Sequence, residues 1–229
     1  MIKNPFRICP FCDAPVSKED FLCPKCRNLI KEYRKTQKCA ICGQDKGRLP
    51  LCEECDKKLP PFRLAISCYY YDGVAKDGLL AYKLGHQFYK AKGFAKLIAE
   101  TLDSYHITPD IITAVPSGIK SFCKMGYNPA LEIAIVLKKF LKVPLCSGFL
   151  RKKLGAIRQS SLSGKERVEN AKNSFVALPF RKRKLQGKTV LLIDDVYTTG
   201  STARACSKLL LKMGAKDVYV LTLLGNAKR

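Results

Sequence analysis

Eight cysteines in four C-x-x-C pairs constrain the first quarter of this 229-residue chain more than any other feature. The pairs are Cys9/Cys12, Cys23/Cys26, Cys39/Cys42 and Cys52/Cys55. Two thiolates held in one tight turn can both face a tetrahedral metal ion, and two such turns complete its coordination. A disulfide framework would require an oxidising compartment, which nothing in the sequence indicates. The spacing therefore predicts metal sites, and zinc is favoured because ferredoxin-type clusters use tighter cysteine runs.

The cysteine region is also an internal repeat. The step from Cys9 to Cys39 is 30 residues, and each half contains two pairs separated by a spacer of 10 or 9 residues. This repeat favours two sequential sites, while an interleaved arrangement stays open. The sequential sites are the first cysteine group (Cys9, Cys12, Cys23, Cys26) and the second cysteine group (Cys39, Cys42, Cys52, Cys55). Because such short spacers bury little apolar surface, we expect bound metal to supply the folding free energy.

Four further cysteines are scattered along the rest of the chain: Cys68, Cys123, Cys146 and Cys206. The two histidines, His86 and His106, show no spacing that links them to any of these thiols. A free cysteine usually behaves as a small buried hydrophobe. We therefore expect three or four of these cysteines to lie in the core.

The chain is strongly basic, with 42 Lys and Arg against 19 Asp and Glu and a net charge of +23. Each four-thiolate zinc site carries about two negative charges, so two sites would reduce the net charge to about +19. A charge of this size attracts polyanions, which include nucleic acid, an anionic membrane surface and phosphorylated small molecules. Charge alone does not choose among these three.

Hydrophobic segments in the sequence are short. No apolar run approaches the roughly 18 residues of a membrane span, and the first residues lead directly to a cysteine pair without the apolar stretch of a signal peptide. We therefore expect a cytoplasmic protein with no membrane span.

The pattern changes after Cys55, where residues 56–61 have the composition of a linker. From Ile66 onward, strand-like and helix-like segments alternate. Expected strands are 67–71, 111–115, 143–147, 189–193 and 218–224, and expected helices are 74–84, 92–104, 128–141, a basic helix ending at 172, and 201–213. Continuous apolar strands such as 189–193 are typical of buried parallel sheets. We therefore predict a zinc-binding domain over residues 1–58 and an α/β domain over residues 66–229.

The most informative segment is VLLIDDVYTTGST, residues 190–202. A buried strand ends in two carboxylates, Asp194 and Asp195, and residues 198–202, the hydroxyl loop, then open a helix. Ligands of parallel sheets bind at the carboxyl ends of strands, and phosphates favour helix N-termini. Gly200 lets the backbone approach a ligand closely. Two carboxylates beside a phosphate would repel it unless they bind something else, and the natural candidates are sugar hydroxyls or a magnesium ion held mainly by substrate oxygens.

This combination resembles the phosphoribosyl-pyrophosphate (PRPP) loop of type I phosphoribosyltransferases. The order of motifs extends the resemblance to the ComF family, zinc-bearing phosphoribosyltransferase-like proteins associated with bacterial DNA uptake and competence. Besides the cysteine pairs it covers Lys83, Val115, Pro116, residues 124–128, Gln159, Leu162, Arg167, Asn170 and Phe175. It implies a type I phosphoribosyltransferase fold, a mainly parallel sheet with flanking helices, preceded by a small double zinc ribbon.

The resemblance also implies roles for individual residues. Asp194 and Asp195 would be the catalytic pair that contacts the ribose hydroxyls, while the hydroxyl loop would hold the 5-phosphate and residues 115–118 the pyrophosphate. The expected PRPP contacts are Val196, Tyr197, Thr198, Thr199, Gly200, Ser201, Thr202, Lys83, Pro116, Ser117 and Lys124. Residues 151–164 resemble the mobile loop that closes over the site, with Lys152, Lys153, Arg158 and Gln159 as its contacts. Magnesium is implied as the companion of PRPP.

The chain departs from the family pattern at several positions. Met125 stands where the family usually has Arg, and Lys120 and Lys124 replace Arg, so bidentate guanidinium donors are missing on the pyrophosphate side. Thr198 occupies the position where purine-salvage enzymes carry an Asp base. Three functions stay open: a PRPP-binding protein that handles single-stranded DNA during uptake, an active transferase acting on an unidentified nucleobase or amine, and a PRPP-sensing regulator.

The ComF resemblance implies single-stranded DNA, a helicase-like competence protein and a second copy of the chain as partners. Aromatic residues could stack on bases, although an α/β domain favours a core position for them: Tyr69, Tyr70, Tyr71, Tyr82, Phe88 and Tyr89. We expect the basic run Arg181-Lys182-Arg183-Lys184 on a solvated surface connection, where it could also contact phosphates.

Overall fold

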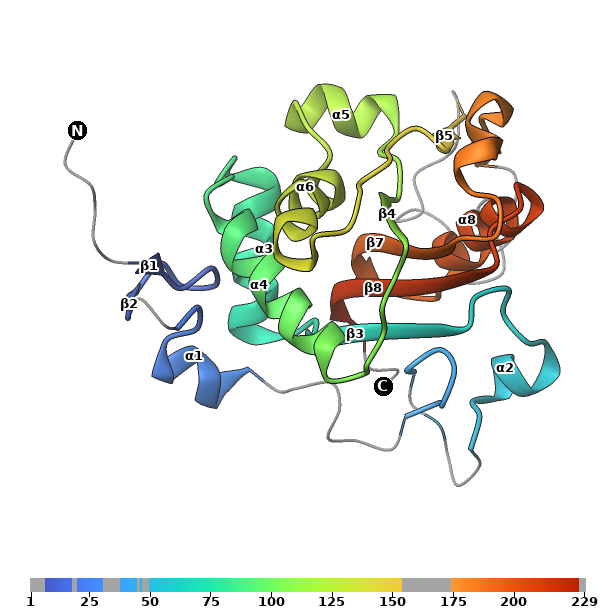
Figure 1. Ribbon diagram of the computed structural model, residues 1–229. Coiled ribbons are helices and arrows are strands. Elements are labelled where there is room, and N and C mark those ends of the chain that lie inside the picture. Colours follow the sequence, from blue (N-terminus) through green and yellow to red (C-terminus); the bar gives the residue numbers. More distant parts are fainter. Residues whose placement is uncertain are drawn as a thin grey trace.

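The computed structural model describes residues 7–17, 20–30, 38–44, 46, 50–153 and 174–226. A four-stranded parallel sheet runs through its centre (Figure 1). The strand order is β3 (Leu64–Tyr70), β8 (Asp217–Gly225), β7 (Thr189–Tyr197) and β4 (Ile111–Ala114). Leu145 adds a single parallel bridge to Ile112 at the β4 edge, where a fifth strand was predicted. The predicted α/β fold with a mainly parallel sheet is confirmed.

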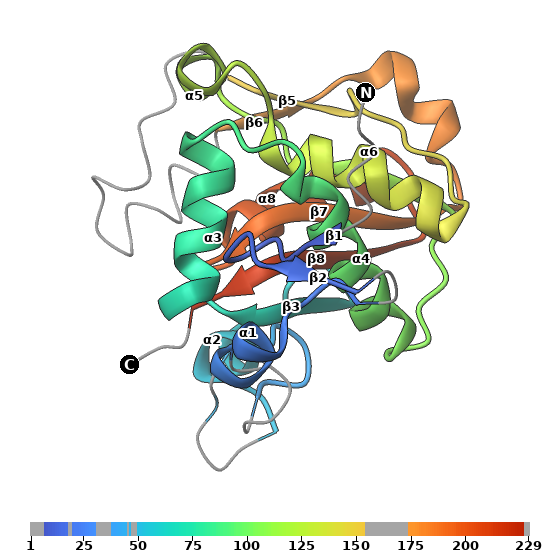
Figure 2. The ribbon, with the colours of Figure 1, turned by 90° about the vertical axis from the view of Figure 1, so that its left-hand side faces the viewer.

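Both faces of the sheet are buried, which explains the continuous apolar run in β7. Leu191 and Ile193 pack under α3 (Gly73–Leu84), α4 (Lys90–Asp103) and α6 (Pro129–Leu141). Val190 and Leu192 point the other way, into the core beneath α8 (Ser201–Lys212). The two views show these helices on opposite faces of the sheet (Figures 1 and 2).

The helices begin close to where the sequence signals place them. Asn128 caps α6, since its Oδ1 accepts hydrogen bonds from the backbone N–H groups of Ala130 at 3.1 Å and Leu131 at 3.4 Å. Pro129 follows at the first helical position, where its missing N–H costs nothing. The predicted helix at 128–141 is therefore confirmed. In the described residues, no helix combines the length and apolar character of a membrane span.

Several short elements were not predicted. Helix α5 (Ile119–Met125) follows β4, strands β5 (Leu150–Lys152) and β6 (Phe175–Ala177) form an antiparallel pair, and a 3₁₀ helix covers Pro179–Lys184. Three-residue strands are too short to show a hydrophobic period, so only the tertiary pairing defines them. The basic helix predicted to end at 172 lies outside the described residues.

The two cysteine groups pack against opposite faces of the sheet. The first, with β1 (Arg7–Ile8), β2 (Pro15–Val16) and α1 (Pro24–Leu29), joins the core beneath α3 and α4. The second, with α2 (Glu53–Lys57), joins the core beneath α8. Figure 1 shows α1 near α3, and α2 at the other end of β3. The predicted double ribbon is thus two small units docked at separate places, and the domain limits at 58 and 66 stay predictions.

Glycines let the first cysteine group approach its helices. A Cβ atom on Gly78 of α3 would lie 2.6 Å from the Cα atom of Phe11, and one on Gly93 of α4 would lie 2.8 Å from Cγ of Pro10. The approach is fixed by an ion pair, because Nζ of the buried Lys90 lies 2.9 Å from the carboxylate of Asp13. Small residues at these two positions therefore make the close docking possible.

The segment predicted as a linker is partly structured. Helix α2 extends to Lys57, and the carbonyl of Lys58 accepts a hydrogen bond from Arg204 of α8 at 3.2 Å. The linker prediction over residues 56–61 is therefore wrong at its start.

Of the four cysteines outside the C-x-x-C pairs, three or four were expected in the core. Cys68, Cys146 and Cys206 are buried, as expected, whereas Cys123 is exposed.

Candidate functional site

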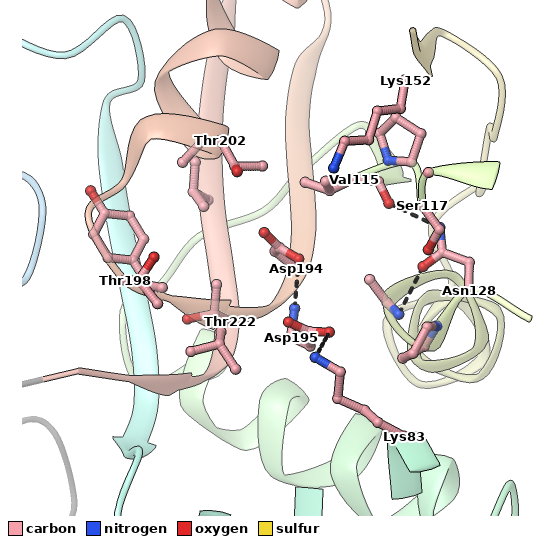
Figure 3. Close-up of a pocket in the computed structure, with 18 of the residues that line it drawn as sticks. Lys83, Val115, Ser117, Asn128, Lys152, Asp194, Asp195, Thr198, Thr202 and Thr222 are labelled. Carbon is pink, nitrogen blue, oxygen red and sulfur yellow. Dashed lines mark hydrogen bonds and ion pairs between the residues drawn. The ribbon is translucent and has the colours of Figure 1, made fainter. Parts of the chain in front are cut away.

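A cavity of about 410 Å³ opens at the carboxyl edge of the parallel sheet (Figure 3). It collects residues that follow four different strands, as expected for ligand sites in open parallel sheets. Its lining includes Tyr71 after β3, Val115, Pro116, Ser117 and Gly118 after β4, Asp194, Asp195, Val196, Tyr197, Thr198, Gly200 and Thr202 from β7 and the hydroxyl loop, Thr222 and Asn226 from β8, and Lys83, Met125, Asn128, Lys152 and Phe175 from neighbouring elements.

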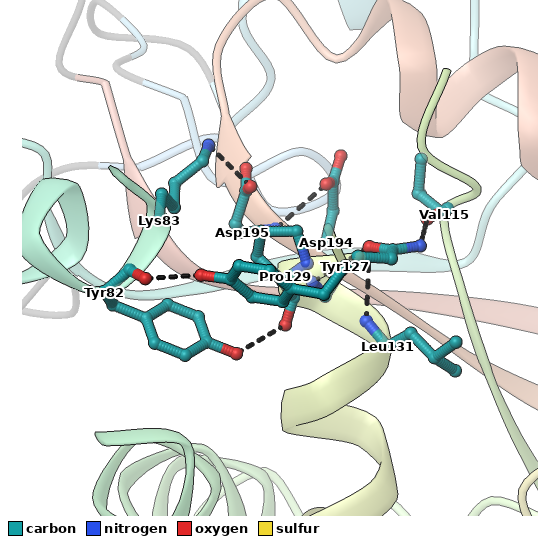
Figure 4. Close-up of polar contacts among 10 residues, drawn as sticks. Tyr82, Lys83, Val115, Tyr127, Pro129, Leu131, Asp194 and Asp195 are labelled. Atoms are coloured by element: carbon teal, nitrogen blue, oxygen red, sulfur yellow. Dashed lines mark hydrogen bonds and ion pairs between the residues drawn. The ribbon is translucent and has the colours of Figure 1, made fainter. Parts of the chain in front are cut away.

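Two adjacent carboxylates occupy the floor of this cavity. Oδ1 of Asp194 accepts a hydrogen bond from the backbone N–H of Asp195 at 2.9 Å. Oδ2 of Asp195 lies 2.6 Å from Nζ of Lys83, which extends from the last turn of α3 (Figures 3 and 4). One carboxylate is thus paired with a cation, while the other is open to a ligand.

The environment of Asp194 disfavours the ionised form of its carboxyl group. Burial and the negative charge of Asp195 raise the pKa of Asp194 to about 7. The N–H of Asp195 and the charges of Lys83 and Lys152 act in the opposite direction without cancelling the rise. In its ionised form, the Asp194 carboxylate can accept a hydrogen bond from a ligand hydroxyl.

A hydrogen-bonded contact between two helices positions Lys83. The hydroxyl of Tyr127 donates to the carbonyl of Tyr82, and the hydroxyl of Tyr82 donates to the carbonyl of Pro129 at 3.0 Å (Figure 4). These bonds connect the end of α3 to the start of α6. Because Lys83 follows Tyr82 directly, its backbone is held where its amine reaches Asp195.

The hydroxyl loop turns the chain from β7 into α8. Gly200 has a φ of +72°, a conformation that favours glycine, and the N-terminus of α8 begins at the next residue. Thr198 and Thr202 line the cavity. Thr199 and Ser201 do not line it; their hydroxyls hydrogen-bond to each other at 2.7 Å and stabilise the turn. The loop therefore presents hydroxyl groups at the N-terminus of a helix, which favours an anion.

The opposite wall is the loop 115–118 after β4. Nδ2 of Asn128 donates to the carbonyl of Val115 at 2.9 Å and fixes the start of this loop. The side chain of Lys152 lies across its end, because a Cβ atom on Gly118 would be 3.2 Å from Cδ of Lys152. Nζ of Lys152 also lies 5.8 Å from the centre of the Phe175 ring. A second cation is therefore held at this wall, opposite the hydroxyl loop (Figure 3).

Most of the predicted site residues that the structure describes meet in this cavity: Asp194, Asp195, Val196, Tyr197, Thr198, Gly200, Thr202, Lys83, Pro116, Ser117 and Lys152. Lys152 was predicted in a mobile loop but belongs to strand β5. Lys153 is exposed and does not line the cavity. Lys124 lies on α5 with its side chain outside the described part, and Arg158 and Gln159 lie outside it altogether.

Sequence reasoning missed Tyr71, Thr222 and Asn226, which also line the cavity. Tyr71 follows β3 and Asn226 follows β8, so both lie at the same edge as Asp194. The rule that parallel strands end at a common edge would have found them, but only with the strand order in hand.

The eight cysteines of the C-x-x-C pairs form the two sequential groups. Within each group all four sulfur atoms lie within 4.8 Å of one another, which excludes the interleaved arrangement in this structure. The backbone N–H of Cys26 donates to Sγ of Cys23 at 3.3 Å, a bond that supports a thiolate. In the second group, burial acts to raise the pKa of Cys39, but N–H groups of Cys42, Cys52 and Ile41 outweigh it and lower that pKa to about 7. Both sulfur sets therefore fit a tetrahedral zinc ion, and the two groups could hold structural zinc.

The family described as "Phosphoribosyl transferase domain" matches residues 85–229, which is more than half of the chain. The chain belongs to this family. The match includes strands β4, β7 and β8, the Asp pair and the hydroxyl loop. The phosphoribosyl transferase fold predicted from the sequence is thus confirmed.

The names of several curated relatives refer to competence or to DNA utilization. The chain is 28% identical to "Competence protein F" of Haemophilus influenzae, over 87% of this chain and 88% of the relative. It is 28% identical to "DNA utilization protein YhgH" of Salmonella typhi, over 94% and 96%, and 23% identical to "Competence protein ComFC" of Bacillus subtilis, over 95% and 94%. Together with the cysteine pairs and the phosphoribosyl transferase domain, these relatives support the ComF-family identity that the sequence motifs indicate.

Proposed function

We propose that the chain binds PRPP at the carboxyl edge of its sheet and uses this site in handling DNA during uptake. The observation that carries the proposal is the convergence of the Asp194/Asp195 pair, the hydroxyl loop and the cation Lys152 in a single cavity. Carboxylates accept hydrogen bonds from sugar hydroxyls, whereas a helix N-terminus and lysines favour phosphates. A ligand with both kinds of group, joined as in a phosphorylated ribose, satisfies the whole lining.

Each part of PRPP has a matching part of the cavity. The ribose hydroxyls would lie against Asp194 and Asp195, and the 5-phosphate would lie at the N-terminus of α8. The pyrophosphate would then extend toward the loop 115–118, where Lys152 supplies a positive charge. Magnesium bound with PRPP would offset charge repulsion between the phosphates and the carboxylates.

A role with single-stranded DNA is supported by one surface feature and by the relatives. Phe180 is 74% exposed on the 3₁₀ helix Pro179–Lys184, with the guanidinium carbon of Arg181 at 5.5 Å from its ring centre. Three more basic residues follow in the same helix. An exposed ring beside several cations can stack on an unpaired base while the cations contact phosphates.

The first experiment measures PRPP binding by calorimetry with magnesium, using the zinc-loaded full chain. Saturable binding is expected, and its absence would overturn the proposal. Pyrophosphate release with a panel of nucleobases and amines then separates an active transferase from a PRPP-sensing protein. Transfer to any of these acceptors would favour the enzyme, and binding without release would favour the sensor.

A second experiment measures the affinity of a fluorescent single-stranded oligonucleotide at about 150 mM salt, with and without PRPP. Salt at this level removes much of the non-specific attraction that a chain of this charge exerts on DNA. Binding that shifts with PRPP is expected for a coupled function. If no DNA binds, the DNA part of the proposal fails while the PRPP part stands on its own measurement.

A further inference from the structure

Arg204 physically connects the hydroxyl loop with the second cysteine group. Its backbone N–H donates to the carbonyl of Gly200 at 2.8 Å and closes the first turn of α8. Its guanidinium reaches the other way, where Nη2 lies 3.5 Å from Sγ of Cys55 and Nη1 donates to the carbonyl of Lys58 at 3.2 Å. A single residue therefore contacts the loop through its backbone and a predicted metal ligand through its side chain.

Tyr197 makes a second connection between the same two parts. It ends β7 and is only 3% exposed, within the apolar cluster that contains the second cysteine group. A Cβ atom added to Gly200 would overlap the Tyr197 hydroxyl, so this ring lies directly against the loop. Tyr197 thus lies against the loop and packs in the same apolar cluster as the second cysteine group.

The second cysteine group is also anchored to the sheet. The backbone N–H of Ala65, in β3, donates to the carbonyl of Ile41 between Cys39 and Cys42 at 2.8 Å. The first cysteine group is attached elsewhere, through Phe11 and the Asp13–Lys90 ion pair on the opposite face of the sheet. The chain therefore contains a matched internal control, since Arg204 links the start of α8 to the second group and not to the first.

We propose that Arg204 and Tyr197 are positioning residues that couple the ligand-binding hydroxyl loop to metal occupancy of the second cysteine group. A zinc ion bound by four thiolates carries about two negative charges, which the Arg204 guanidinium partly neutralises through its N–H···S contact. When the metal leaves, the thiols lose their fixed positions, and both the Arg204 contact and the packing of Tyr197 lose their support. The inference rests on PRPP binding at the hydroxyl loop.

Coupling of this kind is reciprocal, so ligand binding must also retain the metal. The first test uses the unmodified zinc-loaded protein and measures thiol alkylation in the presence of a zinc chelator, mapped by peptide mass spectrometry. With saturating magnesium and PRPP, alkylation of the second group is expected to slow about 5-fold or more. Alkylation of the first group is expected to change less than about twofold. Equal slowing of both groups, or no slowing of either, would overturn the coupling.

The second test uses variants of the connecting residue. Arg204→Ala and Arg204→Gln are expected to weaken PRPP binding about 10-fold, which is within the usual range of coupling between two sites. Both variants should also speed alkylation of the second group, because a metal ligand loses a hydrogen bond. Arg204→Gln keeps a polar helix-forming side chain in case the alanine variant does not fold. The matched control is Asp13→Asn, which removes the corresponding anchor of the first group and is expected to leave PRPP affinity unchanged.

The outcomes separate this inference from the proposed function. If the unmodified protein binds no PRPP, the proposed function fails and the inference falls with it. If PRPP binds normally, but both Arg204 variants retain full affinity and normal protection of the second group, only the coupling is overturned.

Discussion

Nζ of Lys83 lies 2.6 Å from Oδ2 of Asp195, and this ion pair joins the last turn of α3 to the ligand edge of the sheet. The two side chains are 25% and 19% exposed, so water screens the pair only in part. Burial alone would lower the pKa of Lys83, but the carboxylate of Asp195 outweighs it and raises that pKa above its ordinary value. The amine therefore stays charged and contributes to the structure of the cavity.

The first prediction concerns this ion pair. Lys83→Met keeps the aliphatic stem but leaves Asp195 without its cation, so we expect the free energy of unfolding to fall by about 2 kcal/mol. Urea denaturation of Lys83→Met, Asp195→Asn and the double variant measures the interaction. The double variant should lose less than the sum of the single losses, and strict additivity would show that the pair contributes nothing.

The second prediction concerns ligand recognition by the carboxylates. The double variant Asp194→Asn with Asp195→Asn should bind PRPP about 100-fold more weakly or not at all, because two hydrogen bonds to charged groups are lost. Circular dichroism should show an intact fold. Asp217→Asn, at a surface ion pair with Arg63 far along the sheet, is the matched control. Unchanged affinity in the double variant would show that PRPP binds elsewhere.

The third prediction is the pH dependence of binding. Since the pKa of Asp194 is raised to about 7, a ligand that needs its carboxylate form competes with a proton below that pH. Affinity should be about tenfold weaker at pH 6 than at pH 8. The raised pKa also means that this group favours the folded protein at low pH, and that its contribution is lost as pH rises through about 7.

Calorimetry from pH 6 to pH 8 tests this expectation. Asp194→Asn removes the titration of Asp194 and keeps that of the ligand phosphates and of all other groups, so this variant serves as the reference. An identical profile in the variant and the unmodified protein would contradict the assignment of the titration to Asp194.

The fourth prediction concerns the metal. Elemental analysis should give about two zinc ions per chain, since each cysteine group has four sulfur atoms placed for one ion. Chelation should expose the thiols of both groups and lower the melting temperature. A single zinc would leave one group without a metal role, and iron would overturn the assignment of zinc.

The fifth prediction separates backbone strain from a clash at the hydroxyl loop. Gly200 and Gly187 have φ values of +72° and +68°, so alanine at either position is expected to cost about 1 kcal/mol in the free energy of unfolding. At Gly200 the added Cβ atom would overlap the Tyr197 hydroxyl, whereas at Gly187 no atom lies within 4 Å of the added Cβ. Gly200→Ala should therefore weaken PRPP binding as well, whereas Gly187→Ala should not. Equal affinities in the two variants would contradict the role of the Tyr197 contact.

Much of the site was predictable because its residues are neighbours in sequence. The Asp pair and the hydroxyl loop lie within nine residues, 194–202, so local motif reading finds them together. Lys152 shows the opposite case. Its place in the cavity depends on the pairing of β5 with β6, and Lys152 faces Phe175, which lies beyond a segment outside the described residues.

The sequence by itself determined the cysteine repeat, the parallel α/β pattern and the ligand loop, because each depends on spacing or periodicity over a short stretch. Only the tertiary structure decided that the two cysteine groups lie on opposite faces of the sheet, and that Arg204 and Tyr197 connect the second group to the hydroxyl loop. The physical reason is that a short, apolar, metal-binding turn docks wherever complementary surface exists. For the second group, that surface includes residues more than a hundred positions away in the chain.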